Sequence, residues 1–256
     1  MWRWPVVRAR KDAVNNLKGK VFSLHAKLIT LAAQKWSNPD DNSSLANAIY
    51  EAKKAWVPND NILRSIKKWS GEDQNDHQIQ EVIYEGYANW WIAVLVHCLT
   101  DNKNRTVANI RHIFSKYGGS LWESGSVSWI FKKKWIIYID ANTYNYDDIE
   151  ILALETDVQD ISLECWYIKI ITHVEDFNDV VKYIKSKSID IYESKIDYLA
   201  THEVEVNDHD QVLKFTKMLH AFDEDEDVNY ISSNEIITPE LQEKVDTYIE
   251  KHNFHT

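Results

Sequence analysis

The spacing of the apolar residues changes once along this chain, near residue 77, and this change limits the folds that the chain can adopt. Before it, Leu24, Leu28 and Leu31 recur at the spacing of an amphipathic helix. A polar stretch at 71–78 follows. Beyond it, apolar runs of strand length such as 92–99 alternate with helical segments. The pattern predicts helices first and mixed sheet and helix afterwards.

Individual elements follow from the same spacing. Ser43 or Ser44 is the expected N-cap of a second helix, because each follows a chain-breaking NPDDN stretch. Strands are expected at 81–87, 92–99 and 126–131, with a helix at 106–119 between the last two. Short sheets with helices on one face are typical of the α+β class, and here of ferredoxin-like domains.

Charge is distributed very unevenly. The 256 residues carry 40 acidic and 29 basic side chains, a net charge of −11. Residues 1–71 hold 13 basic and 5 acidic groups, whereas 135–256 hold 9 basic and 28 acidic groups. A basic head on an acidic body indicates a phosphate-bearing partner, although a basic helical surface can also serve solubility alone.

Several functional classes are not supported. The chain contains no apolar run long enough for a membrane helix and no signal-peptide pattern at its start. Its two cysteines cannot form a disulfide framework, so a cytoplasmic location is expected. No catalytic or nucleotide-binding motif is present, and the ten histidines are scattered. We therefore expect no enzyme activity, no catalytic residues, no metal and no cofactor. The acidic run DEDEDV at 223–228 could bind a hard cation, but a solvated turn is the better interpretation.

Tryptophan and glycine are present in unusual numbers, 11 and 6. Average usage would give about 18 glycines in a chain of this length. Trp36 and Trp69 follow predicted helices, Trp166 lies in a predicted hairpin, and Trp90 and Trp91 lie in a predicted turn. Such positions favour glycine because its backbone tolerates positive φ. The alternative is an aromatic surface on which bases stack.

The chain resembles the YebC/PmpR family over nearly its whole length. The resemblance is carried by the DNKNRTVANIR segment with KYGG and SGSV at their spacings, and by NPDD, VPND and YEGY. It implies an N-terminal helical bundle followed by two ferredoxin-like domains, one inserted in the other. The expected domains are a basic helical head at 1–77, a middle α+β domain at 78–132 and 207–256, and an acidic inserted domain at 133–206.

The resemblance also implies a function. The family includes proteins described as DNA-binding transcriptional regulators and a mitochondrial translational activator, so the alternative is a ribosome-associated translation factor that contacts ribosomal RNA. Nucleic acid is the expected partner, the ribosome is the alternative site of action, no membrane is involved, and a monomer is the simplest assembly. Lysines and arginines on helix surfaces bind phosphates without reading sequence. The predicted nucleic-acid-binding residues are Arg3, Arg8, Arg10, Lys11, Lys18, Lys20, Arg64, Lys67, Lys68, Asn102, Lys103 and Arg105.

The residues at the start of the predicted helix near 105 have a second interpretation. Backbone N–H groups at a helix N-terminus, beside Lys103 and Arg105, could hold a phosphate. Asn104 and Thr106 could equally serve as helix caps.

Comparison with the family pattern also accounts for the tryptophans. Ten of the eleven stand where the family pattern has glycine, and only Trp129 matches the pattern itself. Restoring glycine at these ten would raise the glycine count to 16. We hypothesise that the gene uses a code in which UGA specifies glycine. The positions are Trp2, Trp4, Trp36, Trp56, Trp69, Trp90, Trp91, Trp122, Trp135 and Trp166.

Overall fold

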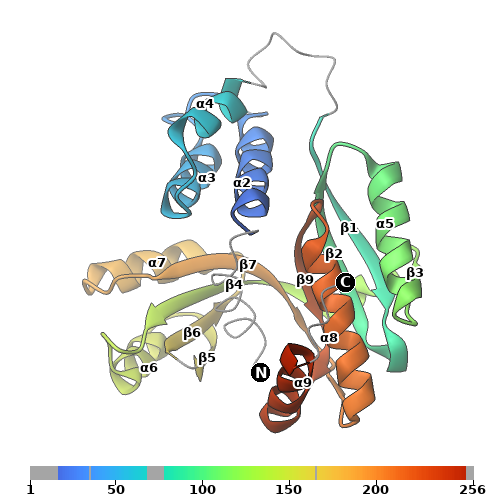
Figure 1. The fold of residues 1–256 in the computed structure, drawn as a ribbon. Helices are drawn as coiled ribbons and strands as arrows, with labels where there is room; N and C mark the ends of the chain where they lie inside the picture. The colour runs from blue at the N-terminus through green and yellow to red at the C-terminus, as the bar shows by residue number, and fades with distance from the viewer. Residues whose placement is uncertain (1–16, 35, 68–77, 165, 252–256) are drawn as a thin grey trace.

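The computed structural model describes residues 17–34, 36–67, 78–164 and 166–251, and it mixes helices with antiparallel sheets (Figure 1). The predicted α+β class is confirmed. Two four-stranded sheets, A and B, each carry helices, and a group of three helices stands apart from both. No described helix is both long enough and apolar enough to cross a bilayer.

The head contains three described helices, α2 (Leu17–Ala33), α3 (Ser43–Lys54) and α4 (Asn59–Lys67). Their shared core is formed by one buried residue from each helix, Ile29, Leu45 and Ile62, among others. The predicted cap at Ser43 or Ser44 is wrong. Asn42 caps α3 instead, because its side chain accepts a hydrogen bond from the backbone N–H of Leu45 and donates to the carbonyl of Ala32 at 2.8 Å.

Helix α3 ends in a conformation that disfavours the residue found there. Trp56 has a φ of 60° and is 88% exposed. Its N–H donates to Lys53, and the N–H of Val57 donates to Ala52 at 2.9 Å, which is the hydrogen-bond pattern of a helix end closed by a left-handed residue. Trp56 thus occupies a glycine-type position.

Replacing Trp56 by glycine is expected to raise the free energy of unfolding by about 1 kcal/mol, since the left-handed strain disappears and an exposed ring contributes little packing. Urea unfolding measures the change. The matched control is Trp122→Gly, at an extended position in a strand, which should lower stability. A loss of stability in both variants would contradict the prediction.

Sheet A has the strand order β3-β1-β2-β9. The strands are β1 (Gln80–Tyr87), β2 (Ala93–Thr100), β3 (Ser120–Trp122) and β9 (Val228–Ser233). Helices α5 (Lys103–Lys116) and α8 (His209–Glu224) cover one face, where Phe114 and Phe222 meet edge to face. The C-terminal helix α9 (Pro239–Lys251) packs against α8, and a short parallel pair joins β8 (Val204–Glu205) to β10 (Glu235–Ile236).

Sheet B has the strand order β5-β6-β4-β7. Its strands are β4 (Phe131–Asp140), β5 (Val158–Glu164), β6 (Tyr167–Thr172) and β7 (Glu193–Ala200). Helices α6 (Tyr146–Leu154) and α7 (Phe177–Ser186) pack on one face over Ile137, Ile139, Ile168 and Ile170. All of these elements lie between β3 and β9 in the sequence, so sheet A is completed by a strand from beyond sheet B.

One connection departs from the expected elements, and another confirms a predicted turn. The strand predicted at 126–131 is wrong, because Ser128–Ile130 forms a 3-10 turn and β4 starts only at Phe131. The turn between β1 and β2 is also a 3-10 segment, Asn89–Trp91. Trp91 in it has a φ of 62°. The strand expected at 126–131 is absent because of long-range hydrogen bonds to Glu85, which are described below.

Candidate nucleic-acid interface

The predicted phosphate-binding residues fall into three groups. Arg3, Arg8, Arg10, Lys11 and Lys68 lie outside the described residues, as do Trp2, Trp4 and Trp69. Lys18 lies in α2, but its side chain is also outside the described part. The residues with described side chains are Lys20, Arg64, Lys67, Asn102, Lys103 and Arg105.

Arg64 and Lys67 lie one turn apart on α4, and both side chains are exposed. Lys20 faces the body instead, and its ammonium group donates to the backbone carbonyl of Asp223. Of these three cations, two therefore face solvent and one faces an acidic segment of the same chain.

The start of α5 is closed by side chains. Asn102 is the N-cap, and its side-chain oxygen accepts a hydrogen bond from the N–H of Arg105 at 3.1 Å. Thr106 does not cap the helix; its hydroxyl lies 2.8 Å from a carboxylate oxygen of Asp227 and 2.7 Å from the hydroxyl of Thr100. Asn104 is exposed and is not the cap. Capping thus takes place at Asn102, while Lys103 remains exposed at the same helix end.

Asp227 joins three parts of the fold. It is 3% exposed, and its carboxylate accepts from Lys27 of α2 at 2.8 Å and from Nη2 of Arg105 at 2.8 and 3.0 Å. Burial by itself would raise the pKa of Asp227, but the hydrogen bonds from Lys27, Arg105 and Thr106 hold it below its usual value. The hydrogen bond with Asp227 also raises the pKa of Arg105. Asp227 is therefore charged and paired at neutral pH.

The interpretation of 223–228 as a solvated turn is wrong for Asp227. In this segment the carbonyl of Asp223 accepts a hydrogen bond from Lys20. The carbonyl of Glu226 and the carboxylate of Asp227 accept hydrogen bonds from Lys27. The groups that bind this segment are lysines and an arginine of the same chain. Sequence spacing could not reveal this site, because Lys27 lies 200 residues away from Asp227.

A second buried carboxylate explains two of the family-like motifs. Glu85 of YEGY is buried, and it accepts backbone hydrogen bonds from Gly125 at 2.8 Å, Val127 at 2.7 Å and Ser128 at 2.8 Å, all in the loop that contains SGSV. Gly125 has a φ of 92°, which favours glycine. These bonds fold the loop around the carboxylate, which is why 126–131 does not continue as a strand.

Substitution of Glu85 by glutamine is expected to lower the free energy of unfolding by about 1–3 kcal/mol, because an amide NH₂ would face backbone donors. Burial would raise the pKa of Glu85, but the loop N–H groups lower it overall. The stabilisation is therefore complete above the unfolded-state pKa of about 4.3 and is lost as pH falls through the lower folded value.

Urea unfolding at a series of pH values measures this effect. The difference between wild type and Glu85→Gln should be largest near neutral pH and shrink below about pH 4. Glu81→Gln is the control, since Glu81 lies on the same strand with an exposed side chain. A Glu85→Gln difference that does not change with pH would contradict the assigned role of the carboxylate.

Aromatic side chains gather at the opposite end of sheet A from the start of α5. Tyr87 lies 5.6 Å from Trp91 and 5.8 Å from Trp122, ring centre to ring centre, and both tryptophans are exposed. This cluster is where the alternative interpretation, an aromatic surface for bases, would apply.

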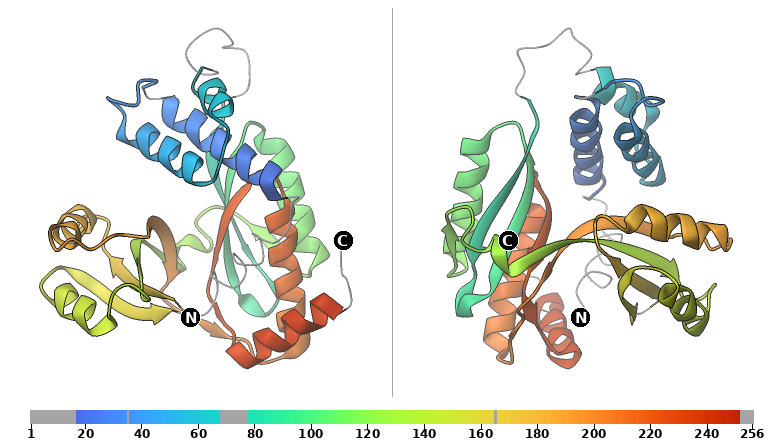
Figure 2. Two further views of the ribbon diagram at one scale, coloured as in Figure 1. Left: turned by 60° about the vertical axis from the view of Figure 1, so that its left-hand side comes forward. Right: turned by 180° about the vertical axis from the view of Figure 1, so that it is seen from behind.

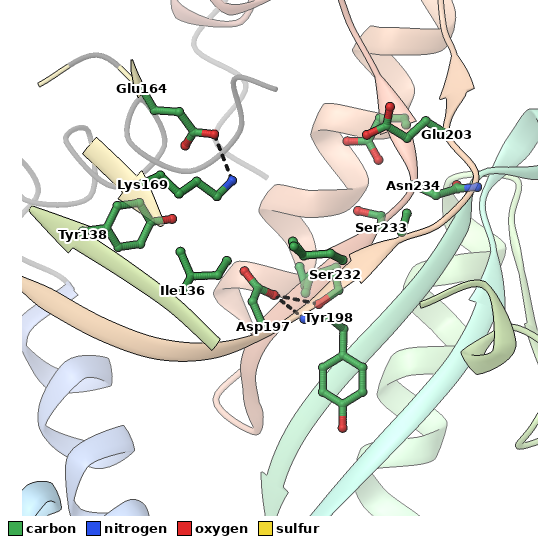
Figure 3. A pocket seen from close by; sticks show the side chains of 14 residues that line it. Ile136, Tyr138, Glu164, Lys169, Asp197, Tyr198, Glu203, Ser232, Ser233 and Asn234 are labelled. Carbon is green, nitrogen blue, oxygen red and sulfur yellow. Dashed lines mark hydrogen bonds and ion pairs between the residues drawn. The ribbon is translucent and has the colours of Figure 1, made fainter. Parts of the chain in front are cut away.

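A small acidic cleft lies between the two sheets (Figure 3). Its volume is about 100 Å³, and it is lined by Glu164, Asp197 and Glu203 among others. Lys169 in the cleft pairs with Glu164 at 2.9 Å, and Asp197 accepts from the hydroxyl of Ser232 at 3.3 Å. Carboxylates dominate the charged groups of this cleft, so the cleft is unfavourable for phosphate.

Comparisons with known proteins give a consistent result. The family model for the "TACO1/YebC protein N-terminal domain" matches residues 2–72, and that for the "TACO1/YebC second and third domain" matches residues 79–235. A "probable transcriptional regulatory protein" of Syntrophus aciditrophicus is 37% identical over 244 residues, 95% of this chain and 97% of the relative. One of the same name from Trichodesmium erythraeum is 34% identical over 91% of this chain and 93% of its own length.

A solved structure has the same fold. A conserved hypothetical protein from Aquifex aeolicus superimposes with a TM-score of 0.79 at 35% sequence identity, covering 88% of this chain and 92% of that one.

Proposed function

Because this chain belongs to the TACO1/YebC family, the family of the YebC/PmpR resemblance, we propose that it regulates gene expression by binding nucleic acid, without catalysing a reaction. The relatives' name, probable transcriptional regulatory protein, supports the regulatory part. The observation that carries the binding part is the placement of Arg64 and Lys67, which lie exposed on α4. Exposed cations on a helix bind phosphates and release counterions.

Two modes of action fit this surface. One is a DNA-binding transcriptional regulator, in keeping with the relatives' name. The other is a translation factor that contacts ribosomal RNA, and the acidic cleft between the sheets favours it. Carboxylates repel nucleic acid but attract basic proteins, and a ribosome offers both kinds of surface. In either mode we expect a cytoplasmic monomer that needs no metal or cofactor.

Sedimentation of cell lysate at low and high salt distinguishes the two. Co-migration of the full chain with ribosomal particles, weakened by salt and by the double substitution Arg64→Gln/Lys67→Gln, would support the translation mode. Tight binding to one promoter without ribosome association would support the transcriptional mode. Binding to neither ribosomes nor DNA would overturn the proposal as a whole.

We further infer that the ten tryptophans at family glycine positions are glycines in the native protein. The left-handed backbone of Trp56 and Trp91 supports this, because a bulky residue there costs about 1–3 kcal/mol. Trp135 behaves differently, since its ring stacks on that of Phe177 in α7, with the ring centres 3.8 Å apart. Peptide masses of the protein from its own cells, together with its codons, test the inference. A UGG codon at Trp56 or Trp91 would contradict it.

A further inference from the structure

We propose that the head is held on the body by an electrostatic clasp, and that nucleic acid competes with the body for the lysines of that clasp. The clasp consists of Lys20 and Lys27 on α2 with the segment 223–227, which runs from the last residues of α8 to the start of β9. Figure 2 shows α2 lying beside the end of α8. The proposal rests on the proposed function, because it assigns a regulation to the same basic surface.

The contacts of the clasp are made by ammonium groups. Lys27 donates to a carboxylate oxygen of Asp227 at 2.8 Å and to the carbonyl of Glu226 at 2.9 Å, and its side chain is only 17% exposed. Lys20, two turns earlier on α2, donates to the carbonyl of Asp223. The ammonium groups of both lysines are thus bound to the body, and in this arrangement they are not available to bind phosphates.

Polar contacts also join the head to the body elsewhere. On α3, Lys54 donates to the carbonyl of Tyr192 at 3.0 Å and lies 4.9 Å from the centre of its ring. Gln34 donates to the carbonyl of Ile79 at 3.0 Å, just before β1. The head therefore contacts both the sheet A side and the sheet B side of the body.

The buried apolar core of the head is separate from the buried cores of the body. The buried apolar cluster of the head consists of residues of α2, α3, α4 and their connections, and within the described part of the chain it includes none from the body. An attachment made of ion pairs and hydrogen bonds weakens with salt and with competing anions. Such an attachment can open without disturbing the core of either part.

Competition follows from the shared lysines. A polyanion reaches Lys20 and Lys27 fully only when the head leaves the 223–227 segment, so it binds the open form more tightly and shifts the population toward it. The apparent affinity of the closed protein is reduced by the fraction of molecules that are open. Weakening the clasp should therefore strengthen binding, even when the substitution removes a positive charge.

The decisive variant is Lys27→Met, which keeps the aliphatic stem and leaves Asp227 paired with Arg105. We expect it to bind a fluorescein-labelled RNA hairpin about threefold more tightly than wild type at low salt, as fluorescence anisotropy measures. Lys67→Met, which removes the same charge from the exposed face of α4, should bind more weakly. Lys27→Arg keeps the clasp and should behave as wild type. Weaker or unchanged RNA binding by Lys27→Met would overturn the competition.

Small-angle X-ray scattering tests the clasp without nucleic acid. Lys27→Met should have a larger radius of gyration than wild type, whereas Lys67→Met should not differ from it. An unchanged radius for Lys27→Met would overturn the clasp. If wild type binds no RNA or DNA, the proposed function fails, but the scattering result still decides whether the clasp exists.

Discussion

Replacing Asp227 by asparagine is expected to lower the free energy of unfolding by about 1.5–3 kcal/mol, because it removes the buried counter-charge of Lys27, which is 17% exposed, and of Arg105, which is half exposed. Lys27 and Arg105 both donate to this carboxylate, and Thr106 adds a hydrogen bond at 2.8 Å. The substitution would weaken the start of α5, the end of α8 and the attachment of α2 together. Urea unfolding followed by circular dichroism measures the loss.

The control for this prediction is Glu226→Gln, one residue earlier, which makes the same charge change at an exposed side chain and keeps the carbonyl that Lys27 uses. It should change stability by less than about 0.5 kcal/mol. Since the folded-state pKa of Asp227 is lowered, its stabilisation is complete above the unfolded-state value of about 3.9 and is lost as pH falls through the folded value. The difference between wild type and Asp227→Asn should therefore diminish in acid. Equal losses in the two variants at neutral pH would contradict the assigned role of Asp227.

The double substitution Arg64→Gln/Lys67→Gln is expected to weaken binding to ribosomal RNA about tenfold at low salt. It should also reduce the slope of log affinity against log salt by roughly 2, since each phosphate contact contributes nearly one unit. Both side chains are exposed on α4, so the fold should be unaffected. Fluorescence anisotropy at several salt concentrations gives both quantities.

The matched control is Lys182→Gln/Lys185→Gln, which removes two charges at the same three-residue spacing from α7 of the sheet B region. Its effect on the salt slope should be close to zero if α7 lies away from the nucleic acid. A similar loss in both double variants would mean that net charge, rather than the α4 surface, governs binding.

Local pattern predicted those elements whose residues interact with near neighbours. The spacing of Leu24, Leu28 and Leu31 indicated α2, and the apolar run at 92–99 indicated β2, because burial of one helical face or of a central strand leaves a regular trace. Prediction failed at 126–131, where Glu85, about forty residues earlier, decides the backbone path. It also missed Asn42 as a cap by one residue, because Asn42 is held by carbonyls of the preceding helix end.

The same distinction holds for the candidate interface. The sequence predicted Arg64, Lys67 and Lys103 as surface cations, which they are, but it gave no indication that Lys27 matters.

By itself, then, the sequence determined the α+β class, the family and the local elements, since periodicity, turn residues and motif spacing depend on residues close together in the chain. Only the tertiary structure decided which charges meet. Asp227 accepts hydrogen bonds from Arg105, 122 residues away in the sequence, and from Lys27, 200 residues away. The acidic segment that was predicted to be a solvated turn therefore contacts the basic head. An ion pair depends on the distance between two charges in space and not on their spacing in the sequence, so its partners can be identified only in the folded chain.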